Sequence, residues 1–207
     1  MSFDAAAARA WVAAIAAAVK ENADYLTQLD SAIGDADHGV NLNRGFTAVV
    51  TALDGFEADA PGAVLVKTGT TLISKVGGAS GPLYGSAFRA LGKALDGSDA
   101  GAAALAAALR EGLAAIQKLG AAAPGDKTIV DALGPAVEAF ERVAPQGLAA
   151  AAAAAASAAE AGAKETTALQ ARKGRASYLG PRSVGHQDPG ATSTHMLLQA
   201  AAEAAAA

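Results

Sequence analysis

The sequence predicts an all-α protein, a single domain over residues 1–207 in which eight helices form an antiparallel up-and-down barrel or bundle. Three observations predict it: 61 of the 207 residues are alanine, aromatic residues make up only 4%, and apolar residues recur at helical spacing between glycine and proline clusters. Alanine has the highest helix propensity, whereas strands favour β-branched and aromatic residues. The composition therefore argues against a sheet-based fold, and the length suits one domain.

The helices are expected between the glycine- and proline-containing breaks, and short connections between them favour antiparallel neighbours. The first stretch is alanine-rich but carries Asp4, Arg9 and Lys20, so it lacks the basic start and the unbroken apolar centre of a signal peptide. The alanine tract 149–159 contains little of the proline, serine and charge that keep linkers unfolded, which favours a helix. The predicted ranges are 4–29, 39–53, 62–76, 81–95, 100–119, 128–143, 147–170 and 190–206.

Alanine-rich helices bury little area per side chain, so the larger residues should supply most of the core. The expected core residues are Trp11, Leu26, Leu29, Phe46, Phe88, Leu113 and Phe140.

Several function classes are disfavoured by composition. The chain has no cysteine, which excludes a disulfide, a thiol nucleophile and a thiolate metal site, and makes the cytoplasm the expected compartment. A net charge of −4 provides no broad basic surface, so nucleic acid is not expected as a direct partner. No stretch of about 20 strongly apolar residues occurs, so no membrane association is expected.

Four segments depart from the alanine background by being rich in Gly, Asp, His, Ser, Thr and Arg. They are 30–45, 77–86, 120–131 and 171–193, and each lies at or beside a predicted helix end. Up-and-down topology could bring several of them to one rim of the bundle, and the functional site is expected there.

The first of these segments contains an acidic turn. Asp30, Asp35 and Asp37 fall within eight positions, and carboxylates so close together repel one another unless a cation lies between them. Oxygen donors without sulfur favour Mg²⁺ or Ca²⁺, and the EF-hand pattern fails because position twelve is Phe46. Mg²⁺ is commonly shared with nucleotide phosphates, so a metal here implies a phosphate ligand nearby. The alternative is a loop in which Asp35 or Asp37 caps the next helix.

The second segment, KVGGASGPLYGS, places a glycine-rich loop directly before a helix that starts near Pro82. Free N–H groups at a helix start bind phosphate, although neither a Walker A motif nor a dinucleotide fingerprint is present. The alternative is a tight glycine turn that allows close helix packing.

The two later segments are more ambiguous. In PGDKT, Asp126 is expected to cap a helix or support the site, with Lys127 in solvent or near phosphates. Residues 171–193 contain several arginines, which suit either phosphate contacts or a generic basic loop. Asp188 is expected to cap the last helix or to approach a ribose or a metal-bound water.

Taken together, GDADHGVNLNRGF, GGASGPLYGSAF, PGDKT and QARKGRASYLGPRSVGHQDPGATS, in this order, resemble the ADP-binding L subunits of dihydroxyacetone kinases. The resemblance extends from Tyr25 to Ser193. It implies an eight-helix antiparallel barrel with the nucleotide at one rim and two Mg²⁺ ions held by Asp30, Asp35 and Asp37. The positions that match the family's nucleotide contacts are His38, Gly39, Val40, Asn41, Ala79, Ser80, Gly120, Ile129, Arg175, Asp188, Pro189 and Gly190.

The resemblance also implies an activity that needs partners. The chain would transfer a phosphoryl group from Mg²⁺-bound ATP, formed from tightly bound ADP, to dihydroxyacetone held by a separate K subunit. An M subunit of the phosphotransferase system would rephosphorylate the ADP. The three aspartates and Arg175 would support the transfer, and no acid or base role is expected for His38 or His186.

Three alternatives stay open. ATP could exchange freely, as in ATP-dependent triose kinases, or nucleotide occupancy could control binding to a transcriptional regulator. The chain could also be a structural helical protein without a ligand. Neither a homodimer nor the exact small keto-sugar acceptor is decided by the sequence.

Overall fold

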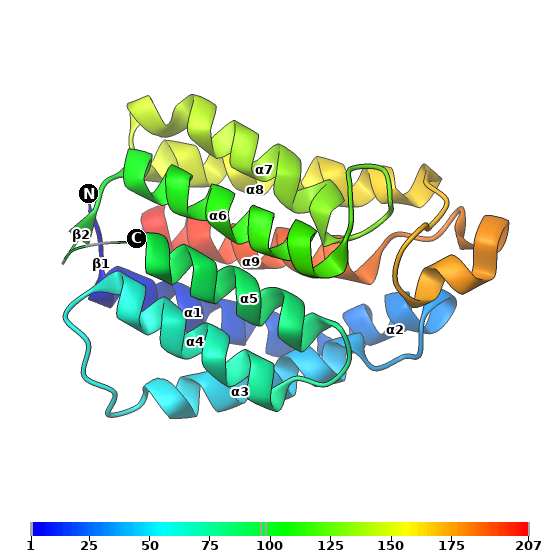
Figure 1. Ribbon diagram of the computed structural model, residues 1–207, viewed down its shortest axis with the longest axis horizontal. Coiled ribbons are helices and arrows are strands. Elements are labelled where there is room, and N and C mark those ends of the chain that lie inside the picture. The colour runs from blue at the N-terminus through cyan, green and yellow to red at the C-terminus, as the bar shows by residue number, and fades with distance from the viewer. Residues whose placement is uncertain (1, 96, 98, 207) are drawn as a thin grey trace.

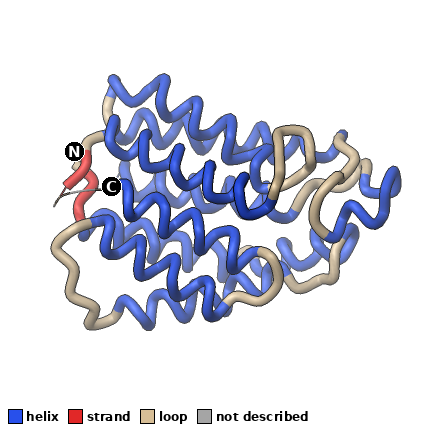
Figure 2. The backbone as a smooth tube through the Cα atoms, viewed as in Figure 1, coloured by secondary structure: helices blue, strands red, loops and turns tan. Residues whose placement is uncertain are grey.

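The computed structural model describes residues 2–95, 97 and 99–206, and it confirms the all-α prediction. Almost all regular structure in this part of the chain is helical, apart from two short antiparallel strands, β1 (Phe3–Asp4) and β2 (Asp99–Ala100) (Figure 2). The α-helices are α1 (Ala5–Glu21), α2 (Ala23–Ile33), α3 (His38–Leu53), α4 (Pro61–Lys75), α5 (Ser80–Ala94), α6 (Ala102–Gly120), α7 (Ile129–Val143), α8 (Leu148–Glu165) and α9 (Pro189–Ala206). Three 3-10 helices are η1 (Ala144–Gln146), η2 (Thr166–Ala168) and η3 (Arg175–Ser183).

The long helices lie side by side in chain order. Each helix from α3 to α8 packs against the next one, and α9 packs back against α1, which also contacts α3 and α4. The connections α2–α3, α4–α5, α6–α7 and α8–α9 lie at one end of the molecule, and both ends of the chain lie at the other (Figure 1).

No described helix combines the length and the apolar character needed to cross a membrane.

Two of the predicted helices differ from the observed ones. The predicted 4–29 helix is divided at Asn22, whose side chain and backbone N–H both donate to the Ala18 carbonyl, at 2.8 and 3.1 Å, and so end α1. Asparagine competes with the helical backbone in this way, and α2 begins at the next residue. The predicted 147–170 helix ends at Glu165 and tightens into η2. The described residues therefore form nine α-helices where the sequence predicts eight.

The core contains the aromatic residues that the sequence singles out. Trp11, Phe46 and Phe88 are buried, with Trp11–Phe88 and Phe46–Phe88 ring centroids 5.6 and 6.3 Å apart. Trp11 also joins α1 to α9, since its indole N–H donates to the Leu197 carbonyl at 3.0 Å. Leu26 and Phe140 are buried as predicted, whereas Leu29 and Leu113 are only partly buried.

The α4 and α5 helices approach each other through glycines. A Cβ on Gly69 would lie 2.4 Å from the Gly85 carbonyl oxygen, and one on Gly62 would lie 2.4 Å from the Gly92 carbonyl oxygen. Real Cβ atoms do not approach oxygen so closely, so the backbones can meet only because these residues lack side chains. This contact fixes the start of α5, and with it the glycine-rich loop, against the end of α4.

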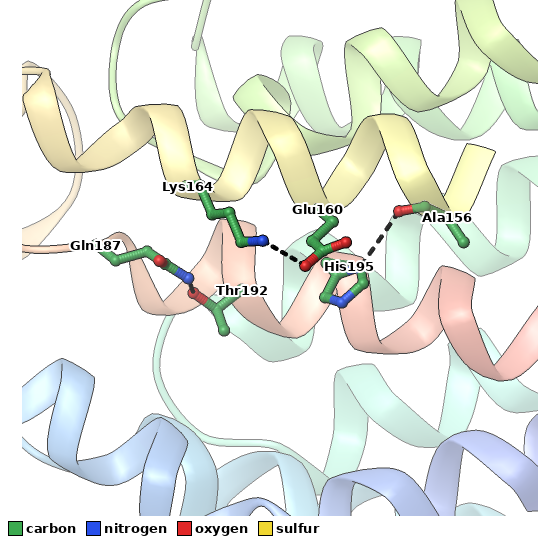
Figure 3. A network of polar contacts seen from close by, with 6 residues as sticks. All are labelled: Ala156, Glu160, Lys164, Gln187, Thr192 and His195. Atoms are coloured by element: carbon green, nitrogen blue, oxygen red, sulfur yellow. Dashed lines mark hydrogen bonds and ion pairs between the residues drawn. The ribbon is translucent and has the colours of Figure 1, made fainter. Parts of the chain in front are cut away.

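The α8 and α9 helices are both rich in alanine and also pack closely. Figure 3 shows polar side chains along this contact, where His195 of α9 lies 3.3 Å from the Ala156 carbonyl of α8 and Lys164 pairs with Glu160 along α8. At the start of α9, the Gln187 side chain donates to Thr192 Oγ1 at 2.8 Å. The last of these contacts joins the two sides of the Asp188–Gly190 stretch at the loop end of the molecule.

Candidate functional site

A cavity of about 270 Å³ opens at the loop end of the molecule, and residues from all four polar segments line it. It therefore brings together α2, the turn before α3, the glycine-rich loop, the α6–α7 connection, the loop around η3 and the start of α9. The predicted site residues in its lining are Asp30, Asp35, Asp37, His38, Ala79, Ser80, Gly120, Ile129, Arg175, Asp188, Pro189 and Gly190.

Three predicted nucleotide contacts, Gly39, Val40 and Asn41, lie outside this lining. Gly39 is buried against α2, where a Cβ would lie 1.9 Å from the Ala23 carbonyl oxygen. Val40 is 56% exposed. Asn41 is buried and accepts a hydrogen bond from Arg44 at 2.7 Å. In this arrangement Gly39 acts in helix packing, and Asn41 supports the surface beside the glycine-rich loop.

The three aspartates converge at the start of α3. Each offers a carboxylate oxygen, and these atoms lie within 4.8 Å of one another. The turn that joins them is tight: Ala36 has a positive φ of 59°, and a Cβ on Gly34 would lie 1.9 Å from Asp30 Oδ1. A cluster of carboxylate oxygens without sulfur or imidazole donors fits Mg²⁺.

Asp30 also fixes the geometry of this turn. Its Oδ2 accepts the backbone N–H groups of Asp37 at 2.9 Å and His38 at 3.2 Å. Asp37 itself occupies the N-cap position of α3 without a capping side-chain hydrogen bond. The capping alternative for Asp37 is therefore wrong, since its carboxylate binds no N–H group of the first turn and stays available to a ligand. Asp30, from the preceding helix, binds the N–H groups at the start of α3 instead.

Arg175 reaches the triad from the far side of the cavity. Its Nε donates to Asp35 Oδ2 at 2.7 Å, although both side chains are largely open to solvent. The guanidinium and the carboxylates therefore face the same space, in which a phosphate and its metal would have opposite charges to contact.

The glycine-rich loop forms the part of the cavity wall next to the start of α3, where Ser80 contacts His38. Gly78 has a positive φ of 66°, and a Cβ on Gly81 would lie 2.5 Å from the Val76 carbonyl oxygen. The expected tight packing is thus present. In addition, no side chain caps the start of α5, so the N–H groups of its first turn are available to an anion.

His38 links three elements of the site. Its Nδ1 lies 3.0 Å from Ser80 Oγ and its Nε2 lies 2.8 Å from Ser193 Oγ. Burial lowers the pKa of His38, while the nearby Asp30 and Asp37 carboxylates act in the opposite direction. A neutral imidazole held at both nitrogens is suited to fixing Ser80 in place.

Two residues of this network are absent from the sequence prediction. The Tyr84 hydroxyl lies 2.7 Å from Ser193 Oγ and donates to the Gly190 carbonyl at 3.0 Å, so it ties α5 to α9, and burial raises the pKa of Tyr84 above its usual value. The available signal is the run of three hydroxyl residues, Thr192–Thr194, near the start of a helix rich in alanine and leucine.

Asp188 lies at the start of α9 and is buried. Its Oδ2 accepts the Ala191 N–H at 2.7 Å, which confirms the expected capping role. Burial raises the pKa of Asp188 to about 7, and the Ala191 N–H and the charge of Lys127 only partly offset this effect.

The PGDKT segment differs from its prediction. Thr128 caps α7, and Asp131 completes the capping box by accepting the Thr128 N–H at 2.8 Å. Asp126 instead accepts the Ala123 N–H within the turn, at 2.8 Å. Lys127 is not solvated but buried. The predictions that Asp126 caps a helix and that Lys127 lies in solvent are wrong. Thr128, the residue after Lys127, is the N-cap of α7 instead.

Comparison with known proteins identifies the family of this chain. The family model described as the DAK2 domain matches residues 32–203. The chain belongs to the DAK2 domain family. The resemblance inferred from its motifs is thereby confirmed.

Curated relatives of this DAK2 domain are kinase subunits. It is 45% identical over 185 residues to the ADP-binding subunit DhaL of PEP-dependent dihydroxyacetone kinase from Escherichia coli (strain K12), covering 88% of both chains. It is 40% identical over 200 residues to the ADP-binding subunit DhaL of PTS-dependent dihydroxyacetone kinase from Lactococcus lactis subsp. lactis (strain IL1403), covering 95% of both.

A solved structure has a similar fold. The dihydroxyacetone kinase from C. freundii in complex with AMP-PNP and Mg²⁺ superposes on this DAK2 domain with a TM-score of 0.73 and 27% identity. The match covers 96% of this chain but only 34% of that kinase, so the chain spans about a third of its length.

Proposed function

We propose that this DAK2 domain is the nucleotide-binding subunit of a dihydroxyacetone kinase that depends on the phosphotransferase system, working in the cytoplasm. It would carry the phosphoryl group from Mg²⁺-bound ATP, formed from tightly bound ADP, to dihydroxyacetone on a K subunit. The observation that carries the proposal is the cavity in which the three aspartates face Arg175 and the uncapped start of α5. The high identity to two DhaL subunits over nearly their whole length supports it.

The chemistry follows from charge placement. Phosphoryl transfer requires alignment and neutralisation of negative charge more than covalent help from the protein. Asp30, Asp35 and Asp37 would hold two Mg²⁺ ions, which neutralise the phosphate oxygens when bound. Arg175 and the N–H groups at Ala79 and Ser80 add fixed positive potential.

No group in the cavity is needed as a general acid or base. His38 is held at both ring nitrogens, and its lowered pKa keeps it neutral near pH 7. The acceptor hydroxyl would be activated on the K subunit, so this chain contributes only alignment and charge.

Further partners belong to the same proposal. An M subunit of the phosphotransferase system would recharge the bound ADP. A transcriptional regulator could bind the same rim, and two copies of the chain could associate as a homodimer. The acceptor would be selected by the K subunit.

The first experiment is native mass spectrometry of freshly purified, desalted protein. We expect one ADP and two Mg²⁺ ions to remain bound. A chain that binds ATP and Mg²⁺ only when both are added would favour exchangeable ATP, and a chain that binds neither would contradict the proposal.

The metal assignment is tested by Asp37→Asn, which removes a charge from the triad. Mg²⁺ and ADP retention should fall together, because each supports the other. The matched control is Asp24→Asn, an exposed acid in the first turn of α2. Retention of ADP and both ions by a triple Asp30, Asp35 and Asp37 to Asn variant would refute the assignment.

A further inference from the structure

Lys127 lies in an unusual environment beside the cavity. Its side chain is 1% exposed, and its Nζ lies among four backbone carbonyl oxygens. It donates to the carbonyls of Thr166 at 2.8 Å, Leu169 at 3.0 Å and Ser183 at 2.7 Å, and also to that of His186. An ammonium group has three N–H bonds, so the four carbonyls take up its entire donor capacity.

This position is costly for a lysine. Among the described residues no carboxylate lies within ion-pair distance of Lys127, although the charge of Asp188 is close enough to act on it. A buried charge without a direct ion pair is strongly unfavourable unless dipoles replace the partner. Lys127 also has a positive φ of 62°, in the left-handed region that a lysine seldom adopts. A lysine that stays buried despite this free-energy cost is expected to fix a segment of the chain that apolar packing alone does not fix.

The segment that Lys127 fixes is the connection between α8 and α9. Residues 166–188 contain only the 3-10 helices η2 and η3, and a connection of this length has little regular structure of its own to fix it. The carbonyls that bind Lys127 lie on both sides of η3, at the start and the end of the segment.

Other contacts support the same closure. The Arg172 N–H donates to the Asp126 carbonyl at 3.0 Å, next to Lys127, and the Gly185 N–H donates to the Thr167 carbonyl at 2.8 Å. The apolar cluster beneath η3 is small: Ala176 and Leu179 of η3 pack with Ala171 around Ile33. The Lys127 ammonium is therefore the polar centre around which this segment folds.

We propose that Lys127 is a positioning residue: its ammonium group, bound by carbonyls on both sides of η3, holds Arg175 over the cavity. Arg175 is the first residue of η3 and reaches Asp35 from there. The inference rests on the proposed function, since the anchored guanidinium is the one assigned to the phosphate. The Lys127 side chain borders the cavity, but carbonyls take up its donors, so it acts through Arg175.

The test begins with Lys127→Met, which keeps most of the side-chain volume but removes the three donors. Amide hydrogen exchange over residues 170–187 should accelerate, and kcat for phosphoryl transfer with the K and M subunits should fall on the order of a hundredfold. The affinity for Mg²⁺–ADP should change much less, because the triad and the glycine-rich loop remain. The matched control is Lys93→Met, an exposed lysine near the far end of α5.

A double-variant cycle separates positioning from general destabilisation. If Lys127 acts through Arg175, the Lys127→Met and Arg175→Ala double variant should be no slower than the worse single variant. If the two losses in kcat multiply instead, the inference is overturned.

Chemical rescue guards against a variant that fails to fold. Because the chain has no cysteine, Lys127→Cys gives a single thiol that can be alkylated in the unfolded chain before refolding. Alkylation with 2-bromoethylamine restores a near-isosteric ammonium and should restore both exchange protection and kcat. Alkylation with 2-bromoethanol gives a neutral side chain of similar size and should restore neither; equal recovery with the two reagents would contradict the inference.

The two proposals fail in different ways. If the wild-type protein transfers no phosphate, the proposed function is wrong, and with it the role of Arg175. The wild-type protein could transfer phosphate normally while Lys127→Met shows the wild-type kcat and the wild-type rate of amide exchange over residues 170–187. In that case only the inference about Lys127 is wrong.

Discussion

At the scale of single residues, the acids of the cavity differ in their surroundings. Asp30 is held by two backbone N–H groups, Asp35 is paired with Arg175, and Asp188 is buried at the start of α9. Burial favours the neutral form of a carboxyl group, as at Asp188. The same side-chain chemistry is thus prepared for metal binding in the acidic turn and for helix capping at Asp188.

The raised pKa of Asp188 predicts a pH-dependent stability in the absence of ligand. Its folded-state pKa of about 7 exceeds the model-compound value of 3.8, so between these values the folded state binds more protons than the unfolded state. The free energy of unfolding should therefore fall as pH rises through this window and level off above it. Asp188→Asn keeps the acceptor for Ala191 and should lack this contribution.

The measurement is urea denaturation of both proteins at several pH values between 4 and 8, without nucleotide. The stability of the wild type relative to the variant should fall by roughly 2–4 kcal/mol across the window. If the free energy of unfolding has the same pH dependence in both proteins, the pKa of Asp188 is not raised in the folded state.

Arg175 can be tested independently of its anchoring. Arg175→Ala removes the guanidinium that faces the acidic turn, so phosphoryl transfer should slow by about 10²–10³-fold while the helices stay folded. Steady-state kinetics with the K and M subunits and far-UV circular dichroism measure the two effects. Arg142→Ala, an exposed arginine at the end of α7, is the control, and an equal loss in both variants would remove Arg175 from the site.

Much of the site is predictable from single residues, because its segments differ in amino-acid composition from the rest of the chain. Acidic, glycine-rich and arginine-rich stretches contrast with the alanine background, and residues from each of them line the cavity. Lys127 could not be placed in this way, since its partners are backbone carbonyls, which every residue carries. Tyr84 and Ser193 are not predicted, because their contact depends on how the whole bundle places α5 relative to α9.

At the scale of elements, the glycines between α4 and α5 determine how closely two helices approach. Gly85→Ala would place a Cβ 2.4 Å from Ile73 Cγ1 and 2.7 Å from the Gly69 carbonyl oxygen. The helices must separate to accept it, which should cost about 1–3 kcal/mol of unfolding free energy.

Gly112→Ala is the matched control for Gly85→Ala, because Gly112 lies inside α6 and the nearest atom to a Cβ there, the Ala87 carbonyl oxygen, would be at an ordinary contact distance of 3.4 Å. This substitution should stabilise the protein by about 0.5–1 kcal/mol through helix propensity alone. Urea denaturation of both variants checks the pair. If both are stabilised alike, the close approach of α4 and α5 does not limit packing.

The helices themselves were largely predictable because alanine and the glycine or proline breaks act locally. The failures occur where a side chain competes with the backbone: Asn22 ends α1 by bonding to Ala18, and Thr166 bonds to the Ala163 carbonyl where α8 ends. Helix η3 has no local sequence signal either, because the residues around it bind Lys127. Lys127 lies 39 positions before Thr166 and 59 positions before His186.

At the scale of the whole molecule, the cavity joins segments from both halves of the chain, so a ligand bound there should oppose global unfolding. At a concentration 100 times its dissociation constant, Mg²⁺–ADP should add about 2.7 kcal/mol, or roughly 5–10 °C in Tm for a domain of this size. Differential scanning calorimetry with Mg²⁺–ADP, and with EDTA added, measures the effect. The Asp37→Asn variant should show a smaller shift, and an equal shift in both proteins would place the nucleotide elsewhere.

Both ends of the chain lie at one end of the helices and the connections between helices lie at the other (Figure 1), where residues of those connections line the cavity. This arrangement limits how such a domain can be joined to another. The 18 residues of α9 run about 27 Å from the cavity rim to the terminal end. A linker from either end of the chain would need about eight extended residues to span the length of the bundle before a fused domain could face the cavity. A short fusion therefore leaves the cavity mouth clear, whereas a fused acceptor domain requires a long linker.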